Sequence, residues 1–201
     1  MQLIHHLVKR IQEITNECGY DENKITFTID DHQTGGCQYE KGTIMTVSFG
    51  GRNTYFASMY PLNADTKPAF MYNAQLAKPA HRASAAAIIS GLSGFLCFSR
   101  VRGPCQTTCH QECREILAEK VKNQKICCIG EAGSIQELFQ DQIVPAPKAD
   151  LIIVTVDGLN EDTQYDVSTS KVPILCIGPS ASGIANLLGA SHFCPHGRTT
   201  R

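Results

Sequence analysis

Asp150-Leu-Ile-Ile-Val-Thr-Val156 decides the fold class of this chain, because it is a short, continuously apolar run rich in β-branched residues. Two similar runs are Lys125-Ile-Cys-Cys-Ile-Gly130 and Val172-Pro-Ile-Leu-Cys-Ile-Gly178. Such runs are typical of parallel strands that are covered on both faces. A helical segment at 134–142 follows the run at 125–130, and another at 182–188 follows the run at 172–178. The alternation predicts an α/β protein with a Rossmann-like open parallel sheet in its C-terminal part.

Residues 191–194 follow the last of these helices and are expected to add a short fourth strand. The linkers between the strands and helices are short, as open α/β sheets require. The alternation of apolar strands and helices begins near residue 120. We therefore place a Rossmann-like domain at 121–201 and a smaller α+β domain at 1–120.

The expected N-terminal domain combines helices with antiparallel strands. Apolar side chains recur at helical spacing over 2–18, and 24–30 alternates as a half-buried strand does. Strands at 43–49 and 53–59 flank the glycine-rich turn at 50–52, which predicts an antiparallel hairpin.

A second helix is predicted from a run of small residues. Residues 82–97 are apolar almost all round, which predicts a buried helix. Its Ala, Ser and Gly residues would allow other backbone segments to approach closely. We assign Cys97 to the end of this helix.

Charge and hydropathy exclude several classes of partner. The 201 residues include 18 Lys and Arg against 19 Asp and Glu, so we expect no nucleic acid partner. No apolar run is long enough to cross a membrane, and the N-terminus lacks the core of a signal peptide. We therefore expect a cytoplasmic protein, and a homodimer stays open. In that compartment ten cysteines indicate metal, iron–sulfur or redox chemistry.

The cysteines are concentrated between residues 97 and 113, where four thiols and His110 occur. On one continuous helix Cys105, Cys109 and Cys113 would be spread over about 12 Å along the axis. Thiolates bind a shared ion at about 2.3 Å each, so that spread is too large for one ion. The three cysteines can share a site only if the helix begins later than Cys105.

The sequence offers such a break. Gly103-Pro104 interrupts regular structure, and Thr108 with Gln111 predicts a capping box at a helix start. Cys105 would then lie in a loop that folds back over the helix. We predict Cys105, Cys109 and Cys113 as ligands of an Fe–S cluster or of a soft metal ion such as zinc, copper or another heavy metal. The alternative is that they are small core residues.

A second candidate group lies near the C-terminus. Cys194 and His196 are two residues apart on a loop that contains Pro195 and Gly197. This loop would follow a strand, where open α/β sheets bind ligands. We predict Cys194 and His196 as the residues that complete the shell, and an ordinary exposed tail is the alternative.

Two further loops are candidates for binding an anion. In the first, Gly178, Ser180 and Ser182 lie between a buried strand and a helix, so their amides could hold a phosphate or carboxylate. The second loop, with Gly130, Gly133 and Ser134, holds the equivalent position after the first C-terminal strand. Neither loop has a nucleotide-binding motif. A tight strand-to-helix turn is the alternative for both.

Two of these segments carry a resemblance to a known family. Ala149-Asp150-Leu-Ile-Ile-Val-Thr-Val-Asp-Gly-Leu-Asn160 and Val172-Pro-Ile-Leu-Cys-Ile-Gly178-Pro179-Ser180-Ala181 resemble the heavy-metal chelation family. In that family a Rossmann-like domain follows a domain that resembles the enolase N-terminal domain. The resemblance implies a ligand cleft between the two domains. The cysteine-dense segment 97–113 has no counterpart in the family pattern.

We therefore predict a metal-binding or Fe–S-cluster-binding protein whose cysteines lie near the interdomain cleft. One alternative is an enzyme that acts on a small anionic substrate or cofactor precursor and uses a reactive Cys109. The other is a thiol–disulfide redox sensor built on residues 105–113. The sequence leaves enzymatic activity undecided and assigns no catalytic residue.

Overall fold

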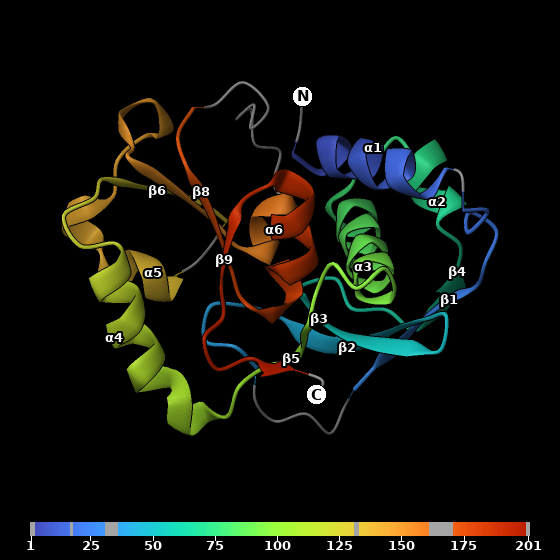
Figure 1. Cartoon of the computed structure of the whole chain (residues 1–201), viewed down its shortest axis with the longest axis horizontal. Coiled ribbons are helices and arrows are strands. Elements are labelled where there is room, and N and C mark those ends of the chain that lie inside the picture. Colours follow the sequence, from blue (N-terminus) through green and yellow to red (C-terminus); the bar gives the residue numbers. More distant parts are fainter. Residues whose placement is uncertain (1–2, 17, 31–35, 131–132, 161–170, 200–201) are drawn as a thin grey trace.

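The computed structural model describes residues 3–16, 18–30, 36–130, 133–160 and 171–199. The chain is an α/β protein with an antiparallel sheet, a separate parallel sheet and helices around both (Figure 1). The predicted fold class is therefore confirmed.

The antiparallel sheet has the strand order β3-β2-β1-β4. Its strands are β1 (Ile25–Ile29), β2 (Thr43–Phe49), β3 (Arg52–Ser58) and β4 (Ala64–Thr66). The predicted hairpin is present, since β2 pairs with β3 in register from Thr43 opposite Ser58 to Phe49 opposite Arg52. Gly50 and Gly51 form its turn with φ of 56° and 74°, a conformation that glycine adopts without steric cost.

The parallel sheet has the strand order β6-β7-β8-β9. Its strands are β6 (Ile126–Ile129), β7 (Leu151–Val154), β8 (Ile174–Ile177) and β9 (Ser191–Phe193). All three predicted apolar runs and the short fourth strand are therefore parallel strands. Neighbours in the sheet are also neighbours in the sequence. Among the described strands there is thus no reversal of order of the kind that opens a ligand crevice in doubly wound folds.

Helices cover both faces of the parallel sheet, as the apolar runs predicted. The helices are α1 (Leu3–Thr15), α2 (Ala69–Asn73), α3 (Pro79–Phe95), α4 (His110–Lys120), α5 (Gly133–Leu138) and α6 (Ser182–Leu188). One face packs with α1, α3 and α6, and the other packs with α4 and α5 (Figure 1). Short 3₁₀ turns are η1 (Thr107–Cys109), η2 (Gln140–Gln142), η3 (Ala146–Lys148), η4 (Val156–Leu159) and η5 (Pro179–Ala181).

Helix α3 is buried almost all round and lies between the antiparallel sheet and α6 (Figure 1). Its glycines permit this packing. A Cβ atom at Gly91 would lie 2.8 Å from Val47 Cγ1, and one at Gly94 would lie 2.3 Å from Thr54 Cγ2. The predicted close approach of backbone segments is therefore confirmed.

The main hydrophobic core crosses the predicted domain boundary. Phe56 and Ile89 of the N-terminal part belong to the same buried cluster as Ile152 and Cys176 of the parallel sheet. The chain also returns at its end, because β10 (Arg198–Thr199) pairs with β5 (Val101–Gly103). The division into domains at residue 120 stays a prediction.

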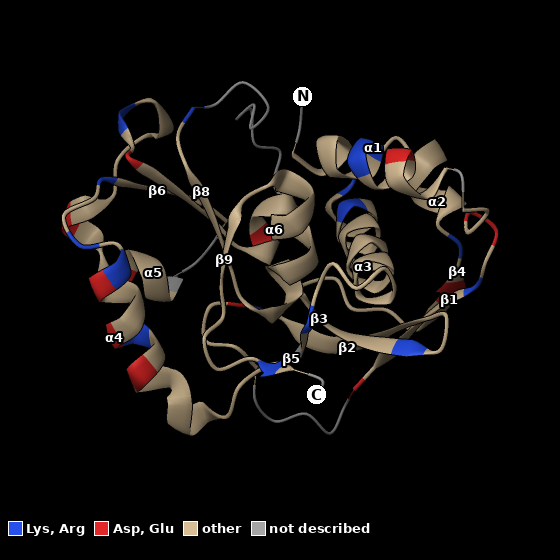
Figure 2. Cartoon of the chain, in the orientation of Figure 1, with Lys and Arg blue, Asp and Glu red and all other residues tan. Residues whose placement is uncertain are grey.

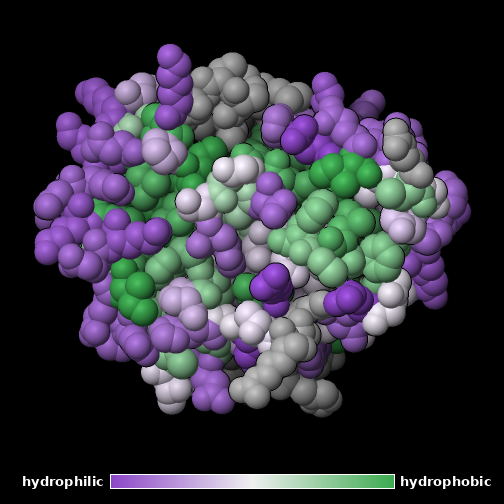
Figure 3. Space-filling view, in the orientation of Figure 1, coloured by the Kyte–Doolittle hydropathy of each residue, from purple (hydrophilic) through white to green (hydrophobic). Residues whose placement is uncertain are grey.

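The surface carries charges of both signs around the periphery, and they alternate along α4 (Figure 2). Polar side chains surround apolar patches, one of which lies over α3 in this view (Figure 3). Among the described residues no helix is long and apolar enough to cross a membrane.

Candidate functional site

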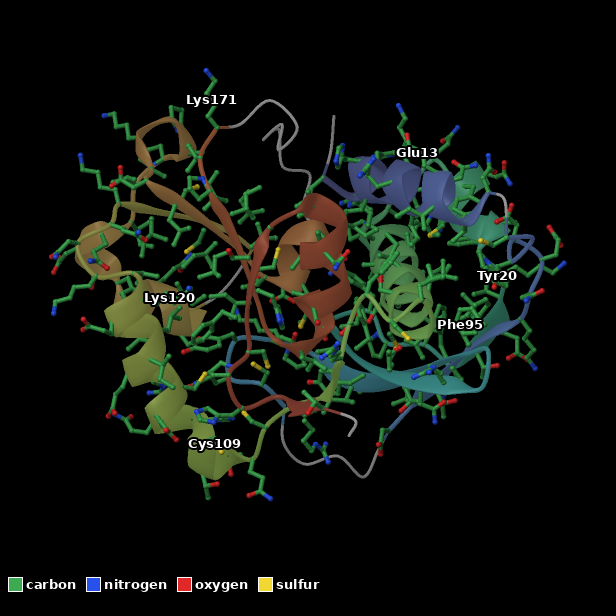
Figure 4. The ribbon with its side chains drawn as sticks, viewed as in Figure 1. Glu13, Tyr20, Phe95, Cys109, Lys120 and Lys171 are labelled. Carbon is green, nitrogen blue, oxygen red and sulfur yellow. The ribbon has the colours of Figure 1, made fainter. Side chains whose placement is uncertain are left out.

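The segment after α3 places Cys105 outside the helix that carries Cys113, as a shared site for these cysteines requires. It passes through β5 and reaches Cys105 before any helix begins. Cys109 ends η1 and is the N-cap of α4, which begins at His110 (Figure 4). The predicted interruption between Cys105 and the helix is therefore confirmed. The predicted capping box is wrong, because the α4 N-cap is Cys109 and it makes no side-chain capping bond.

Cys97 is not part of a buried helix. Helix α3 ends at Phe95, and Cys97 follows in an exposed turn with φ of 62°. The small residues that predict burial of the helix stop before it. The thiol therefore lies on the surface, and our assignment of Cys97 to the helix was wrong.

Four thiols from three chain segments lie close together: Cys37, Cys105, Cys113 and Cys194. Burial is the largest cause of the raised pKa of each thiol, and smaller electrostatic interactions join Cys105 to the other three and Cys194 to Cys37 and Cys113. Together these effects raise the pKa of Cys194 to about 12. Cys109 lies at the edge of this group, since it interacts with Cys105 and Cys113. We call the first four residues the four-thiol pocket.

Strand pairing brings Cys194 to Cys105. The β10–β5 pair places Arg198 opposite Gly103, and Arg198 Nε donates a 2.9 Å hydrogen bond to the Pro104 carbonyl. The loop between β9 and β10 is tight, with Gly197 N bonded to the Cys194 carbonyl. A Cβ atom at residue 197 would lie 2.6 Å from Cys194 Sγ, so glycine keeps the space beside this sulfur open.

Cys37 enters the pocket on a segment that the start of α4 holds in place. Gln38 Nε2 donates to the His110 carbonyl at 2.8 Å, and Arg114 Nε donates to Gln38 Oε1 at 2.7 Å. Ser134 Oγ donates to the Gln38 carbonyl at 3.0 Å. These bonds hold the segment of Cys37 beside α4, the helix that carries Cys113. No spacing pattern in the sequence marks Cys37, because it is distant along the chain from the other three cysteines.

The described His, Cys, Asp and Glu side chains include no group of three or more that could hold a metal ion together. The four thiols therefore interact electrostatically without forming, among the described residues, a set that could hold a metal ion. His196, a predicted ligand, instead places Nε2 3.5 Å from Glu112 Oε2. Its role as a ligand stays a prediction, as do the ligand roles of Cys105, Cys109, Cys113 and Cys194.

The loop predicted to bind an anion contacts an internal carboxyl group. Ser180 N and Ser180 Oγ donate hydrogen bonds of 2.8 and 3.0 Å to the two oxygens of Glu40. Gly178, with φ of 98°, leaves room for this carboxyl group, because a Cβ atom there would lie 2.3 Å from Glu40 Oε1. Ser182 bonds Ser99 at 2.7 Å. An external ligand at this loop stays a prediction.

Glu40 connects the loop to the four-thiol pocket. Desolvation and, to a smaller extent, the nearby charge of Asp157 raise the pKa of its carboxyl group to about 8, against the lowering effect of hydrogen bonds from Ser180 and Tyr55. The charge of Glu40 in turn raises the pKa of Cys37 and of Cys194. Sequence reasoning missed Glu40, since no local pattern marks an isolated glutamate after an irregular segment.

The other candidate loop is packed against the neighbouring strand end. Gly130 has φ of 110°, and a Cβ atom there would lie 2.7 Å from Gly158 N. Gly133 begins α5, and Ser134 bonds Gln38 as described above. This loop thus supports the segment that carries Cys37, and its role in binding a ligand stays a prediction.

Of the four remaining cysteines, Cys18 is exposed and the other three belong to the parallel sheet. Cys176 is buried in the main core, and Cys127 and Cys128 are partly buried on β6. Burial raises the pKa of Cys128 and of Cys176 to about 12.

Comparison with known proteins adds no relative. No family model matches the chain, and neither the curated proteins nor the solved structures include a match. The resemblance to the heavy-metal chelation family therefore stays a prediction. The class of protein must be argued from the four-thiol pocket itself.

Proposed function

We propose that this protein binds an iron–sulfur cluster through Cys37, Cys105, Cys113 and Cys194. The observation that carries the proposal is the gathering of these four thiols from three distant segments into one pocket. Four cysteine thiolates are the standard ligand set of both [2Fe–2S] and [4Fe–4S] clusters.

The spacing of the sulfurs favours a cluster over a single zinc or copper ion. One ion needs all its thiolates at about 2.3 Å, so the sulfurs must nearly touch one another. The described side chains form no group that could hold a single ion. In a [4Fe–4S] cluster each thiolate binds a different iron atom, so the sulfurs are farther apart than around a single ion. The four thiols interact electrostatically but form no group that could hold a single ion, and this arrangement fits a cluster better.

Proton balance predicts how the site depends on pH. Burial raises the pKa of each thiol in the four-thiol pocket, so the thiols are protonated in the metal-free protein at neutral pH. Only thiolates bind iron, so cluster assembly must release these protons. Assembly is therefore favoured by raising the pH, and acid favours loss of the cluster.

The test is anaerobic reconstitution with ferrous iron, ferric iron and sulfide, which together supply the oxidation states of a cluster, followed by iron and sulfide analysis and visible absorption. We expect one cluster per chain in the wild-type protein. Cys37→Ser and Cys194→Ser should reduce bound iron strongly, because each removes a ligand that the other predicted ligands cannot replace. The matched controls are Cys97→Ser and Cys176→Ser, an exposed and a buried thiol outside the pocket, which should retain the wild-type iron content.

Two results would contradict the proposal. A wild-type protein that binds no iron and sulfide under these conditions contradicts it directly. Equal iron content in the Cys37→Ser and Cys97→Ser variants contradicts the ligand assignment. If the iron-free protein instead forms a disulfide within residues 105–113 under mild oxidation, the redox-sensor alternative is supported.

A further inference from the structure

Tyr39 is a buried side chain whose hydroxyl group lacks a conventional acceptor. The residue is 2 % exposed, and within the described part of the chain its hydroxyl oxygen makes no hydrogen bond of good geometry. The group that it faces is the Cys113 thiol, a weak acceptor with which it makes at most a hydrogen bond of poor geometry. A hydroxyl group that is buried without an acceptor destabilises a fold, so its presence calls for a partner.

The neighbouring residue fixes the position of Tyr39. Gln38 is held from two sides, by its bond to the His110 carbonyl and by the bond that it accepts from Arg114. Both partners belong to α4, the helix that carries Cys113. Gln38 therefore holds Tyr39 beside Cys113, and the Gln38 side chain also interacts with the Cys113 thiol.

A thiolate ligand would supply the missing acceptor. A protonated thiol is a weak acceptor, whereas a thiolate is anionic and binds an O–H donor well. We propose that Tyr39 tunes the reduction of the cluster by donating a hydrogen bond to the Cys113 ligand. This inference rests on the proposed function. It makes Tyr39 a positioning and tuning residue, not a ligand.

The direction of the effect follows from charge. One-electron reduction adds a negative charge to the cluster and its ligands. A hydrogen bond to a ligand sulfur stabilises the more negative state, so it raises the reduction potential. Removing the Tyr39 hydroxyl group should therefore make reduction less favourable.

The test compares Tyr39→Phe with the wild-type protein after reconstitution, using dithionite as the one-electron donor in a potentiometric titration. We expect the equilibrium constant for reduction to fall about tenfold, which is about 59 mV for one electron. The matched control is Tyr72→Phe, because the Tyr72 hydroxyl group bonds Thr15 Oγ1 at 2.8 Å on α1. This control should leave the potential unchanged.

Unfolding of the metal-free proteins separates tuning from a structural role. Since the Tyr39 hydroxyl group lacks a good acceptor there, Tyr39→Phe should unfold at the wild-type temperature or above it. Tyr72→Phe loses a hydrogen bond and should unfold at a lower temperature.

The possible failures are distinguishable. A wild-type protein without a cluster overturns the proposed function and this inference with it. A normal iron content with equal potentials for Tyr39→Phe and the wild-type protein overturns the inference alone. It is also overturned if metal-free Tyr39→Phe unfolds at a clearly lower temperature or if the folded variant takes up no iron, because Tyr39 would then serve the fold or cluster assembly.

Discussion

At the scale of single residues, Glu40 shows how burial links charge to stability. In the Gly178–Ser182 loop, Ser180 donates two hydrogen bonds to the Glu40 carboxyl group. Desolvation is the main cause that raises the pKa of this group from 4.5 to about 8. The folded protein therefore binds this proton more tightly than the unfolded chain does. The stabilisation is complete below about pH 4.5 and is lost as the pH rises through about 8.

Glu40→Gln removes this titration while keeping a similar shape. In the metal-free protein we expect the unfolding free energy of the variant to change less between pH 5 and pH 9 than that of the wild-type protein. Urea unfolding at a series of pH values measures this. Glu137→Gln, an exposed carboxylate on α5, is the control and should follow the wild-type curve. Parallel curves for wild type and Glu40→Gln would contradict the raised pKa.

The residues of the candidate site were only partly predictable from the sequence. Cys105 and Cys113 are close together in the chain, so their spacing and the break at Gly103-Pro104 indicated a shared site. Cys37 reaches them through tertiary contacts such as the bonds of Gln38 to α4 and to Ser134. Such contacts depend on tertiary structure, and no local pattern encodes them.

At the scale of elements, α3 depends on glycine for its packing. Alanine is favoured over glycine in a helix by about 1 kcal/mol. In Gly94→Ala, however, the new Cβ atom would meet Thr54 Cγ2 at 2.3 Å. Thr54 cannot easily move, because it is 4 % exposed and its hydroxyl group bonds the Val47 carbonyl. We expect the steric cost to prevail, with a net loss of about 1–3 kcal/mol in the free energy of unfolding.

Chemical denaturation of the variant measures this loss, and Ser84→Ala is the matched control. Ser84 lies on the same helix, and its hydroxyl group bonds only within that helix, to the Ala80 carbonyl. Its replacement should change the free energy of unfolding by less than about 0.5 kcal/mol. If Gly94→Ala is as stable as Ser84→Ala, the close packing of α3 on β3 is not needed for stability.

At the scale of the whole molecule, the sequence predicted the parts better than their association. The apolar runs identified each strand of the parallel sheet, since strands covered on both faces need continuous apolar sequence. The shared core of the two sheets and the β10–β5 pair join residues that are far apart in the chain. Their pairing depends on the packing of the complete chain, so periodicity within short windows cannot indicate it.

The β10–β5 pair joins the segments that carry Cys194 and Cys105, and it gives the last prediction. Arg198 holds the end of the chain to the Pro104 carbonyl, so it fixes Cys194 relative to Cys105. Because supporting contacts of this kind typically change metal affinity by about 10–100-fold, Arg198→Ala should lose iron to a chelator about tenfold faster than the wild-type protein. Arg52→Ala, an exposed arginine at the β2–β3 turn, should lose iron at the wild-type rate. Equal rates for all three proteins would mean that Cys194 is held without this contact. A faster rate confined to Arg198→Ala would show that a strand pair at the end of the chain controls the thiol site.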